Sequence, residues 1–194
     1  MVIAALPSPA RRTLLLALSA LAALGTARAA DDGAGDGDAE YQVKAAFVCK
    51  FGNYIDWPAP ALGAAGEPFR IGVLASGAVA EEFRRMAGAA SVAGRPVEVK
   101  QLARGEAPQG LHVVFVSRAM SGHVDEVIAA VQGRPVLTVT ELDPGASTGM
   151  ASMINFVVVD DKVRFDIVLP PATQSGLRIS VRLLGVARRV EGRP

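Results

Sequence analysis

Apolar residues follow helix and strand spacings in turn along the chain. From Glu40 onward they recur at steps of three and four residues, which predicts an amphipathic helix that ends at Trp57-Pro58. The apolar stripe of this helix comprises Tyr41, Ala45, Val48, Phe51, Gly52 and Ile55, with Lys44 and Lys50 beside it. Residues 58–67 are rich in Pro, Ala and Gly and predict a linker loop.

The middle of the chain predicts strands that alternate with helices. Strands are expected at residues 69–74, 97–99, 111–116 and 135–140. One helix is expected through Val79, Phe83 and Met86, and a second, capped by Ser117 or Ser121, with Val124, Val127, Ile128 and Val131 inward. The order strand, helix, strand, strand, helix, strand predicts an α/β fold of three layers, in which helices flank a mixed, mostly parallel sheet.

The last third of the chain predicts a C-terminal β-hairpin and a final helix. Residues 153–159 and 163–169 are strand-like runs joined by the polar connector 160–162, and Pro170-Pro171 ends the second run. The residues of the final helix that are expected to point toward the core are Leu177, Val181, Leu184 and Ala187. Its outward residues are Arg178, Arg182, Arg188 and Arg189.

Arginines of the final helix and of the hairpin form the predicted binding site. Arg178 and Arg182 are four residues apart and would share a helix face, and Arg164 would approach them if helix and hairpin pack together. Guanidinium groups gathered in this way suit carboxylate or phosphate groups of a ligand or partner. Trp57, the single tryptophan, is expected to be a packing anchor and is the candidate apolar neighbour of this site. The alternative is a solvated helix face whose arginines are favoured by the helix dipole.

Residues 1–29 have the plan of a secretory signal peptide. Arg11-Arg12 precede an apolar run over residues 14–24, and small residues follow up to Ala29. We therefore expect export to the periplasm with cleavage after Ala29, by either the Sec or the twin-arginine route. The acidic, glycine-rich residues 30–39 are expected to form a disordered N-terminus of the mature chain.

Composition narrows the classes of function. The 194 residues are 51% hydrophobic, which provides ample material for the core of a single domain over residues 40–190. The 20 basic and 19 acidic residues give a net charge of +1, which does not indicate binding to nucleic acid. Cys49 is the only cysteine, so neither an intrachain disulfide nor a thiolate-rich metal site is expected, and with two histidines a histidine-rich site is not expected either. No GxGxxG or phosphate-loop motif is present, so no cofactor is expected.

One motif resembles the serine turn of hydrolases. Gly145–Gly149 has the GxSxG pattern around Ser147, but that turn needs a preceding strand and a following helix, and here a strand follows. His112 and His123 both lie upstream, whereas the hydrolase order puts histidine last. His112 is expected to be packed or hydrogen-bonded in a strand, and His123 to be solvated near a helix start. We therefore expect no catalytic residue and no enzyme, with a hydrolase acting through Ser147 as the enzymatic alternative.

A series of short motifs runs in order through residues 40–190. It comprises Tyr41–Phe47, Trp57-Pro58, Phe69–Leu74, His112–Ser117, Val136–Val139, Gly149-Met150, Met153–Val157, Lys162–Ile167, Gly176–Ser180 and Leu183-Leu184. In this order the motifs resemble those of the YfiR-like family of periplasmic proteins. The chain departs from the family pattern at Leu111, where the family often has a cysteine, so redox control through that disulfide is not expected. It also departs at Val168, where the family favours Asn.

The resemblance implies a periplasmic α/β regulator without known catalysis. Such a protein binds the periplasmic domain of an inner-membrane diguanylate cyclase and represses it, which lowers cyclic di-GMP and disfavours biofilm. A small ligand and a homodimer are further partners that stay open, whereas no nucleic acid is expected. The alternative function is a periplasmic small-ligand-binding module that serves a sensor or a transporter.

Overall fold

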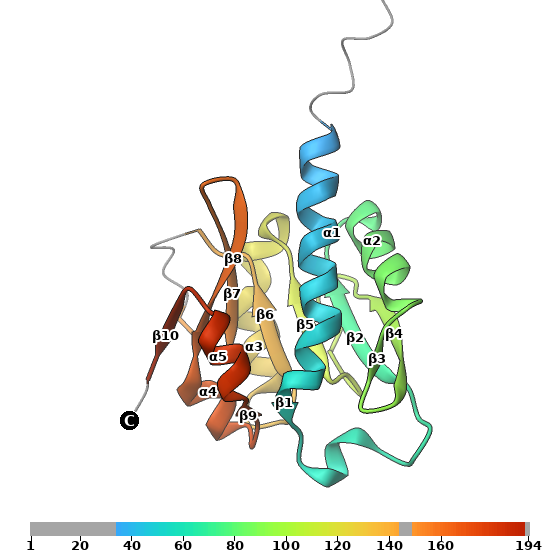
Figure 1. Cartoon of the computed structure of the whole chain (residues 1–194). Helices are drawn as coiled ribbons and strands as arrows, with labels where there is room; N and C mark the ends of the chain where they lie inside the picture. The colour runs from blue at the N-terminus through green and yellow to red at the C-terminus, as the bar shows by residue number, and fades with distance from the viewer. Residues whose placement is uncertain (1–33, 144–148, 193–194) are drawn as a thin grey trace, which may run out of the picture. The chain divides into compact units, whose positions relative to one another are not determined.

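The computed structural model describes residues 34–143 and 149–192 of the chain (Figure 1). The predicted signal peptide, residues 1–29, lies outside the described residues, and so does Ser147 of the predicted serine turn. Residues from Asp38 onward form one compact unit. The boundaries predicted for the leader, the N-terminal segment and the domain stay predictions.

An eight-stranded sheet forms the middle layer of this unit. Its strands lie side by side in the order β10 (Arg189–Glu191), β8 (Lys162–Val168), β7 (Ile154–Val159), β6 (Leu137–Thr140), β5 (Val113–Val116), β2 (Phe69–Leu74), β4 (Arg95–Gln101) and β3 (Ser91–Val92). The strands from β7 to β4 run parallel, and β10 is parallel to β8, whereas β8 is antiparallel to β7 and β3 to β4. The predicted mixed, mostly parallel sheet is confirmed.

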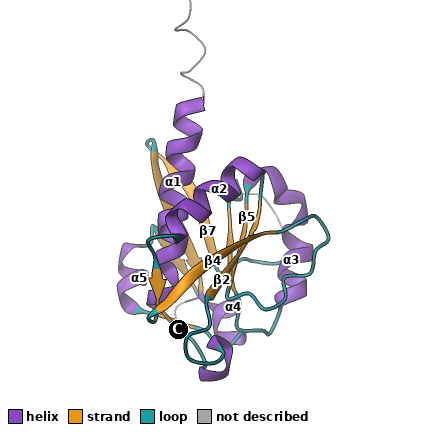
Figure 2. Ribbon diagram, turned by 90° about the vertical axis from the view of Figure 1, so that its right-hand side faces the viewer, coloured by secondary structure: helices purple, strands orange, loops and turns teal. Residues whose placement is uncertain are grey.

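Helices cover both faces of the sheet (Figure 2). They are α1 (Ala34–Phe51), α2 (Gly77–Ala87), α3 (Val124–Val131), α4 (Leu169–Gln174) and α5 (Val181–Val186), with short 3₁₀ helices η2 (Gly52–Tyr54), η3 (Ala59–Leu62) and η4 (Arg118–His123). Alternate residues of β5 face opposite sides, so Val113 and Phe115 join the hydrophobic cluster under α1, α2 and α5, and Val114 and Val116 join the one under α3. The predicted three layers are therefore confirmed.

The two central helices form where the hydrophobic spacing predicts them. In α3 the four residues expected to point inward, Val124, Val127, Ile128 and Val131, are buried. The predicted serine cap of α3 is wrong, because 3₁₀ helix η4 intervenes and α3 begins after His123, which makes no side-chain capping bond. Helix α2 does have a serine cap, since Ser76 Oγ accepts a hydrogen bond from the backbone N–H of Val79 at 3.4 Å.

Helix α1 ends earlier than the sequence predicts. It stops at Phe51, and after η2 the chain extends as β1 (Ile55–Asp56) instead of continuing as helix to Trp57-Pro58. Gly52 lies so close to neighbouring side chains that a Cβ there would come within 2.8 Å of Val92 and 2.9 Å of Phe69. The approach of these residues accounts for a glycine at the point where the helix gives way to an extended segment. The predicted helical position of Ile55 is therefore wrong, although its side chain is buried.

The C-terminal β-hairpin and a final helix are confirmed, but the helix is shorter than the spacing of residues 177–189 predicts. Strands β7 and β8 pair through a turn in which Asp160 and Asp161 have φ of 49° and 55°, as two-residue hairpin turns require. Beyond the hairpin, the final helix is limited to α5, with β9 (Arg178–Ile179) before it and β10 after it. Pro170-Pro171 lie in the first turn of α4, a position that tolerates proline.

Ser180 explains why no continuous final helix forms. Its backbone N–H donates to Tyr54 O at 2.9 Å, continuing the antiparallel pairing of β9 with β1, and its Oγ accepts from Leu183 N at 3.4 Å. The helix therefore starts after Ser180, and Val181, which was expected to point inward, is 80% exposed. Leu177 is buried as expected.

Candidate partner-binding surface

Three of the four predicted site residues are exposed arginines. Arg178 lies on β9, Arg182 on α5 and Arg164 on β8. In the part of the chain that the structure describes, none of the three takes part in an ion pair or a side-chain hydrogen bond. Their guanidinium groups are therefore available to an anionic group from outside. The prediction that Arg178 and Arg182 share one helix face is wrong, because a strand holds the first and a helix the second.

Exposed valines accompany Arg178 and Arg182. Val181 is 80% exposed and Val186 is 65% exposed, and both belong to α5. Figure 1 shows α5 and β9 close together, beside the lower half of α1. We call Arg178, Val181, Arg182 and Val186 the β9–α5 surface. Exposed apolar side chains next to arginines are typical of protein interfaces.

Trp57 is half-buried and packs within the fold. Its indole packs edge-on against Phe69, with ring centroids 5.4 Å apart, and its Nε1–H donates to Gly52 O at 3.0 Å. The expected packing role is thus confirmed. Trp57 directly follows β1, where Asp56 lies opposite Arg178 in the antiparallel register. By anchoring β1, the tryptophan helps to fix β9 in place.

The remaining arginines of the C-terminal segment have other surroundings. Arg188 makes a two-pronged ion pair with Asp166, with Nε 2.8 Å from Oδ1 and Nη2 on Oδ2, and its backbone N–H donates to Phe165 O at 2.9 Å. Arg188 therefore ties the C-terminal segment to β8 and is not free for a partner. Arg164 belongs to the eight-stranded sheet, whereas Arg178 belongs to the separate β1–β9 pair. The structure thus groups Arg178 with Arg182 and leaves Arg164 on another element.

A buried charge cluster, which sequence reasoning missed, lies at the carboxyl ends of β5 and β6. Lys44 of α1 is 1% exposed, and its Nζ lies 2.7 Å from Glu141 Oε1 and also contacts Glu40. Glu141 Oε2 accepts from Tyr41 Oη at 3.1 Å and from the backbone N–H of Arg118 at 2.8 Å. Burial and the negative charge of Glu141 raise the pKa of Tyr41, which stays protonated.

This Lys44–Glu141 cluster joins α1 to the loops that follow β5 and β6. Lys44 was expected only to flank the apolar stripe. The one signal in the sequence is the spacing of Glu40 and Lys44, four residues apart on a helix, which indicates a local pair but not the distant Glu141. Every charged group of the cluster has a partner inside the chain, so the cluster fixes α1 against these two loops.

His112 and Cys49 are also satisfied within the fold. His112 Nδ1 accepts from the backbone N–H of Arg70 at 2.9 Å, and its ring stacks on Phe69 at 4.6 Å, which confirms a packed histidine. Burial lowers the pKa of His112, so the ring is neutral near pH 7. Cys49 is 3% exposed, and burial raises its pKa to about 11, which keeps the thiol protonated and unreactive.

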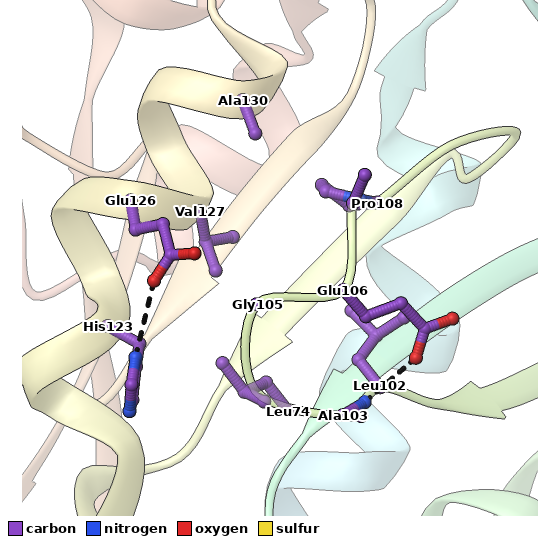
Figure 3. Close-up of a pocket in the computed structure, with 11 residues that line it drawn as sticks. Leu74, Leu102, Ala103, Gly105, Glu106, Pro108, His123, Glu126, Val127 and Ala130 are labelled. Atoms are coloured by element: carbon purple, nitrogen blue, oxygen red, sulfur yellow. Dashed lines mark hydrogen bonds and ion pairs between the residues drawn. The ribbon is translucent and has the colours of Figure 1, made fainter.

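A hollow of about 230 Å³ lies between α3 and the loop after β4 (Figure 3). His123 Nδ1 is 3.3 Å from Glu126 Oε2, and Glu106 Oε2 accepts from the backbone N–H of Ala103 at 2.9 Å. The second oxygen of Glu106 is 2.7 Å from Lys100 Nζ. The carboxylates at this hollow are therefore engaged locally, and no nucleophile adjoins His123 in the contacts that it makes.

Metal-binding clusters and membrane-spanning helices are both absent from the described residues, 34–143 and 149–192. In these residues no three side chains of His, Cys, Asp or Glu come together as a metal site would require. None of the helices in the same residues is long and apolar enough to cross a bilayer.

Comparison with known proteins identifies the family. A family model described as YfiR/HmsC-like matches residues 41–188, which is most of the chain. The chain therefore belongs to the YfiR/HmsC-like family, as its ordered motifs indicate, and this is a family of periplasmic regulatory proteins. No curated protein sequence matches the chain.

Proposed function

We propose that this member of the YfiR/HmsC-like family binds the periplasmic domain of an inner-membrane diguanylate cyclase and holds that enzyme inactive. Repression lowers cyclic di-GMP, and release from repression favours biofilm. The protein itself is a regulator and not an enzyme. The observation that carries the proposal is the β9–α5 surface, where two arginines without acidic partners in the described residues adjoin two exposed valines.

The chemistry of the β9–α5 surface suits an acidic partner with an apolar centre. Burying a valine side chain stabilises a complex by about 1.5–3 kcal/mol. A hydrogen bond between arginine and a carboxylate contributes about the same amount when water is excluded. The β1–β9 pairing and the Ser180 cap hold Arg178 and Val181 in fixed positions before the partner arrives. Binding therefore has to order the two arginine side chains but not the backbone that carries them.

Repression requires that the protein prefer the inactive state of the cyclase. The shift in that equilibrium is limited by the difference between its affinities for the two states. Moving a cyclase from almost wholly active to almost wholly inactive takes a difference of about 10⁴-fold, or about 5.5 kcal/mol. A membrane-spanning enzyme with two conformations can carry this bias from the periplasm to its cytoplasmic catalytic domain.

The proposal includes export by the predicted leader, with cleavage after Ala29. The motive is the charged start, the apolar run over residues 14–24 and the small residues before the cut. N-terminal sequencing of the protein recovered from the periplasm should begin at Ala30. A periplasmic protein that still begins at Met1 would contradict it.

Capture of the full-length cyclase from detergent-solubilised membranes tests the binding surface. Wild-type protein should retain the cyclase, and Arg178→Glu/Arg182→Glu should lose at least about tenfold in apparent affinity, because both charges would then repel an acidic partner. The matched control, Arg104→Glu/Lys162→Glu, changes two exposed basic residues, one in the loop after β4 and one at the tip of the β7–β8 hairpin, that have no ion pair in the described residues, and should bind as wild type does. Capture by Arg178→Glu/Arg182→Glu equal to that by the wild type would show that the β9–α5 surface does not bind the cyclase. No capture by the wild type would contradict the proposal that the cyclase is the partner.

A further inference from the structure

A second hollow, of about 280 Å³, lies at the amino ends of the parallel strands β2, β5 and β6. Its charged and polar lining includes Arg70 near the start of β2, His112 just before β5 and Arg134 before β6. The predicted linker loop forms another wall through Pro60, Ala61, Gly63 and Glu67. None of these residues belongs to the β9–α5 surface or to the Lys44–Glu141 cluster. The hollow is therefore separate from both groups of charged residues described above.

Positive charge around this amino-end hollow exceeds the negative charge. Arg134 donates only to backbone carbonyls, Ala130 O at 3.2 Å and Pro108 O at 3.4 Å. Arg95, which braces the linker loop, likewise donates only to carbonyls, at Gly63, Ala64 and Glu67. In the described residues neither guanidinium has a carboxylate partner.

Arg70 is only loosely neutralised. Its closest carboxylate oxygens are those of Glu67 at 3.9 Å and Glu98 at 3.8 Å, both beyond hydrogen-bond distance. Glu67 is the one carboxylate that lines the hollow. Two guanidinium groups line the hollow and that of Arg95 braces its wall, against Glu67 on the lining and Glu98 beside Arg70, so positive charge is in excess and the space favours an anion.

The backbone beneath Arg70 is held rigidly. The N–H of Arg70 donates to Nδ1 of the buried His112 at 2.9 Å, and His112 N–H donates back to Arg70 O at 2.9 Å. This reciprocal pair fixes the start of β2 against the residue before β5. His112 is thus a positioning residue for Arg70, and only the outer part of the arginine side chain remains to be ordered by a ligand.

The remaining walls of the hollow are apolar and its volume is small. Leu111, Pro135 and Val136 line it together with Pro60. Pockets for small molecules usually have volumes of about 300–1,000 Å³, so this hollow is just below that range. It can take a body of one ring or a short chain, but not a dinucleotide.

We propose that the amino-end hollow binds a small organic anion, with a carboxylate or phosphate group held by Arg70 and Arg134 and a short apolar body against the proline and valine walls. The inference is independent of the proposed repression of a cyclase. Glu67 competes with the ligand for Arg70, because its carboxylate is nearest to that guanidinium on the lining of the hollow. Occupation of the hollow displaces Glu67 and engages both arginines.

Trp57 provides a built-in probe for this site. It is the only tryptophan of the chain, and its ring centroid lies 6.1 Å from that of His112. Fluorescence titration of the purified domain with benzoate and with phenyl phosphate compares the two acidic groups on one apolar body. Benzyl alcohol, which has the same body without charge, serves as the neutral control. The wild type should bind at least one of the anions with a millimolar or lower dissociation constant, and the alcohol should not bind.

Single substitutions distinguish the contributions of Arg70 and Arg134 to anion binding from that of Glu67. Arg70→Gln and Arg134→Gln should each weaken binding of the preferred anion by about tenfold or more, since each removes a charge-assisted contact. Glu67→Gln should strengthen binding several-fold, a gain that an unfolded variant cannot produce. Arg104→Gln, an exposed arginine that does not line the hollow, should bind as wild type does.

Three results would overturn the inference. The first is no binding of either anion by the wild type up to about 10 mM, the weak limit expected for small ligands in a formed site. The second is equal binding of an anion and benzyl alcohol, which would assign the signal to the apolar walls alone. The third is unchanged affinity in a folded Arg70→Gln/Arg134→Gln variant. A preference for benzoate identifies a carboxylate ligand, and a preference for phenyl phosphate identifies a phosphate ligand.

Discussion

Two groups of charged residues in this protein have opposite surroundings. In the Lys44–Glu141 cluster, lysine and glutamate are 1% and 0% exposed and every charge is paired within the chain. On the β9–α5 surface, Arg178 and Arg182 are exposed and no described residue pairs with them. The charges of the Lys44–Glu141 cluster are neutralised within the folded chain, whereas the two arginines remain available to a partner.

The two groups also differ in the hydration that their charges lose when the protein folds. A buried ion pair loses hydration, and its mutual attraction only offsets that loss, so the pair constrains where α1 sits more than it adds to stability. An exposed arginine keeps its hydration and contributes almost nothing to the folded state. Substitutions in the cluster should therefore affect folding, and substitutions on the surface should affect binding.

The largest expected effect on stability comes from Lys44→Met. The substitution leaves Glu141 buried without its cation, which should reduce the free energy of unfolding by about 3–5 kcal/mol in denaturant titrations. The control, Lys50→Met on the same helix, removes an exposed charge and should change stability by less than about 0.5 kcal/mol. The double variant Lys44→Met/Glu141→Leu should be more stable than Lys44→Met alone. Equal stability of Lys44→Met and Lys50→Met would show that the buried pair does not hold α1.

A smaller loss is expected for Cys49→Ser. The hydroxyl would be buried in the hydrophobic cluster to which the thiol belongs, at a cost of about 1–3 kcal/mol. Cys49→Ala, which adds no polar group, should cost less than Cys49→Ser if polarity dominates over lost volume. In the native wild type, thiol reagents should label Cys49 far more slowly than a free peptide thiol, because the thiol is buried with a raised pKa. Labelling at the rate of a free thiol would contradict its burial.

The pH dependence of folding tests the buried histidine. Because burial lowers the pKa of His112, the unfolded chain binds a proton at a higher pH than the folded chain does. The contribution of His112 to stability is therefore complete above the ordinary pKa of about 6.5 and is lost as the pH falls below it. The slope of unfolding free energy between about pH 7.5 and about pH 5.5 should be smaller in His112→Gln than in the wild type. Identical slopes would mean that folding does not shift the pKa of His112, which would contradict its burial as a neutral ring.

The smallest effect on stability is expected on the β9–α5 surface. Arg178→Gln/Arg182→Gln, which avoids placing a second acid opposite Asp56, should leave the free energy of unfolding within about 0.5 kcal/mol of the wild type, because neither arginine has an ion-pair partner in the described residues that folding has to satisfy. Thermal unfolding of the two proteins in the same buffer measures the difference. A loss as large as that of Cys49→Ser would assign these arginines to the fold and remove the contrast between the two regions.

The central sheet and its helices follow from local hydrophobic spacing, and the sequence therefore predicts them well. Residues 69–74 form β2 as expected, and the four inward residues of α3 are the ones that the three- and four-residue steps indicate. The C-terminal segment was predicted wrongly because its structure depends on distant partners. Ser180 bonds to Tyr54, so the pairing of β9 with β1 overrides the helical spacing between Leu177 and Ala187.

The same distinction applies to the functional residues. The exposure of Arg178 and Arg182 and the packing of Trp57 could be predicted from residue type and context. The Lys44–Glu141 cluster could not, because Tyr41 and Glu141 are 100 positions apart and no local pattern joins them. The amino-end hollow also combines residues from separate loops, since Arg70, His112 and Arg134 meet only after the parallel strands align.

Cellular cyclic di-GMP tests the central claim most directly. It should be measured in the wild type, in a strain that lacks this gene, and in a strain that lacks both the gene and its candidate membrane cyclase, under conditions where the cyclase is expressed. Repression predicts a higher level in the single deletion, a return to the wild-type level or below in the double deletion, and no complementation by Arg178→Glu/Arg182→Glu. An unchanged level in the single deletion would contradict the proposal that this protein represses a diguanylate cyclase.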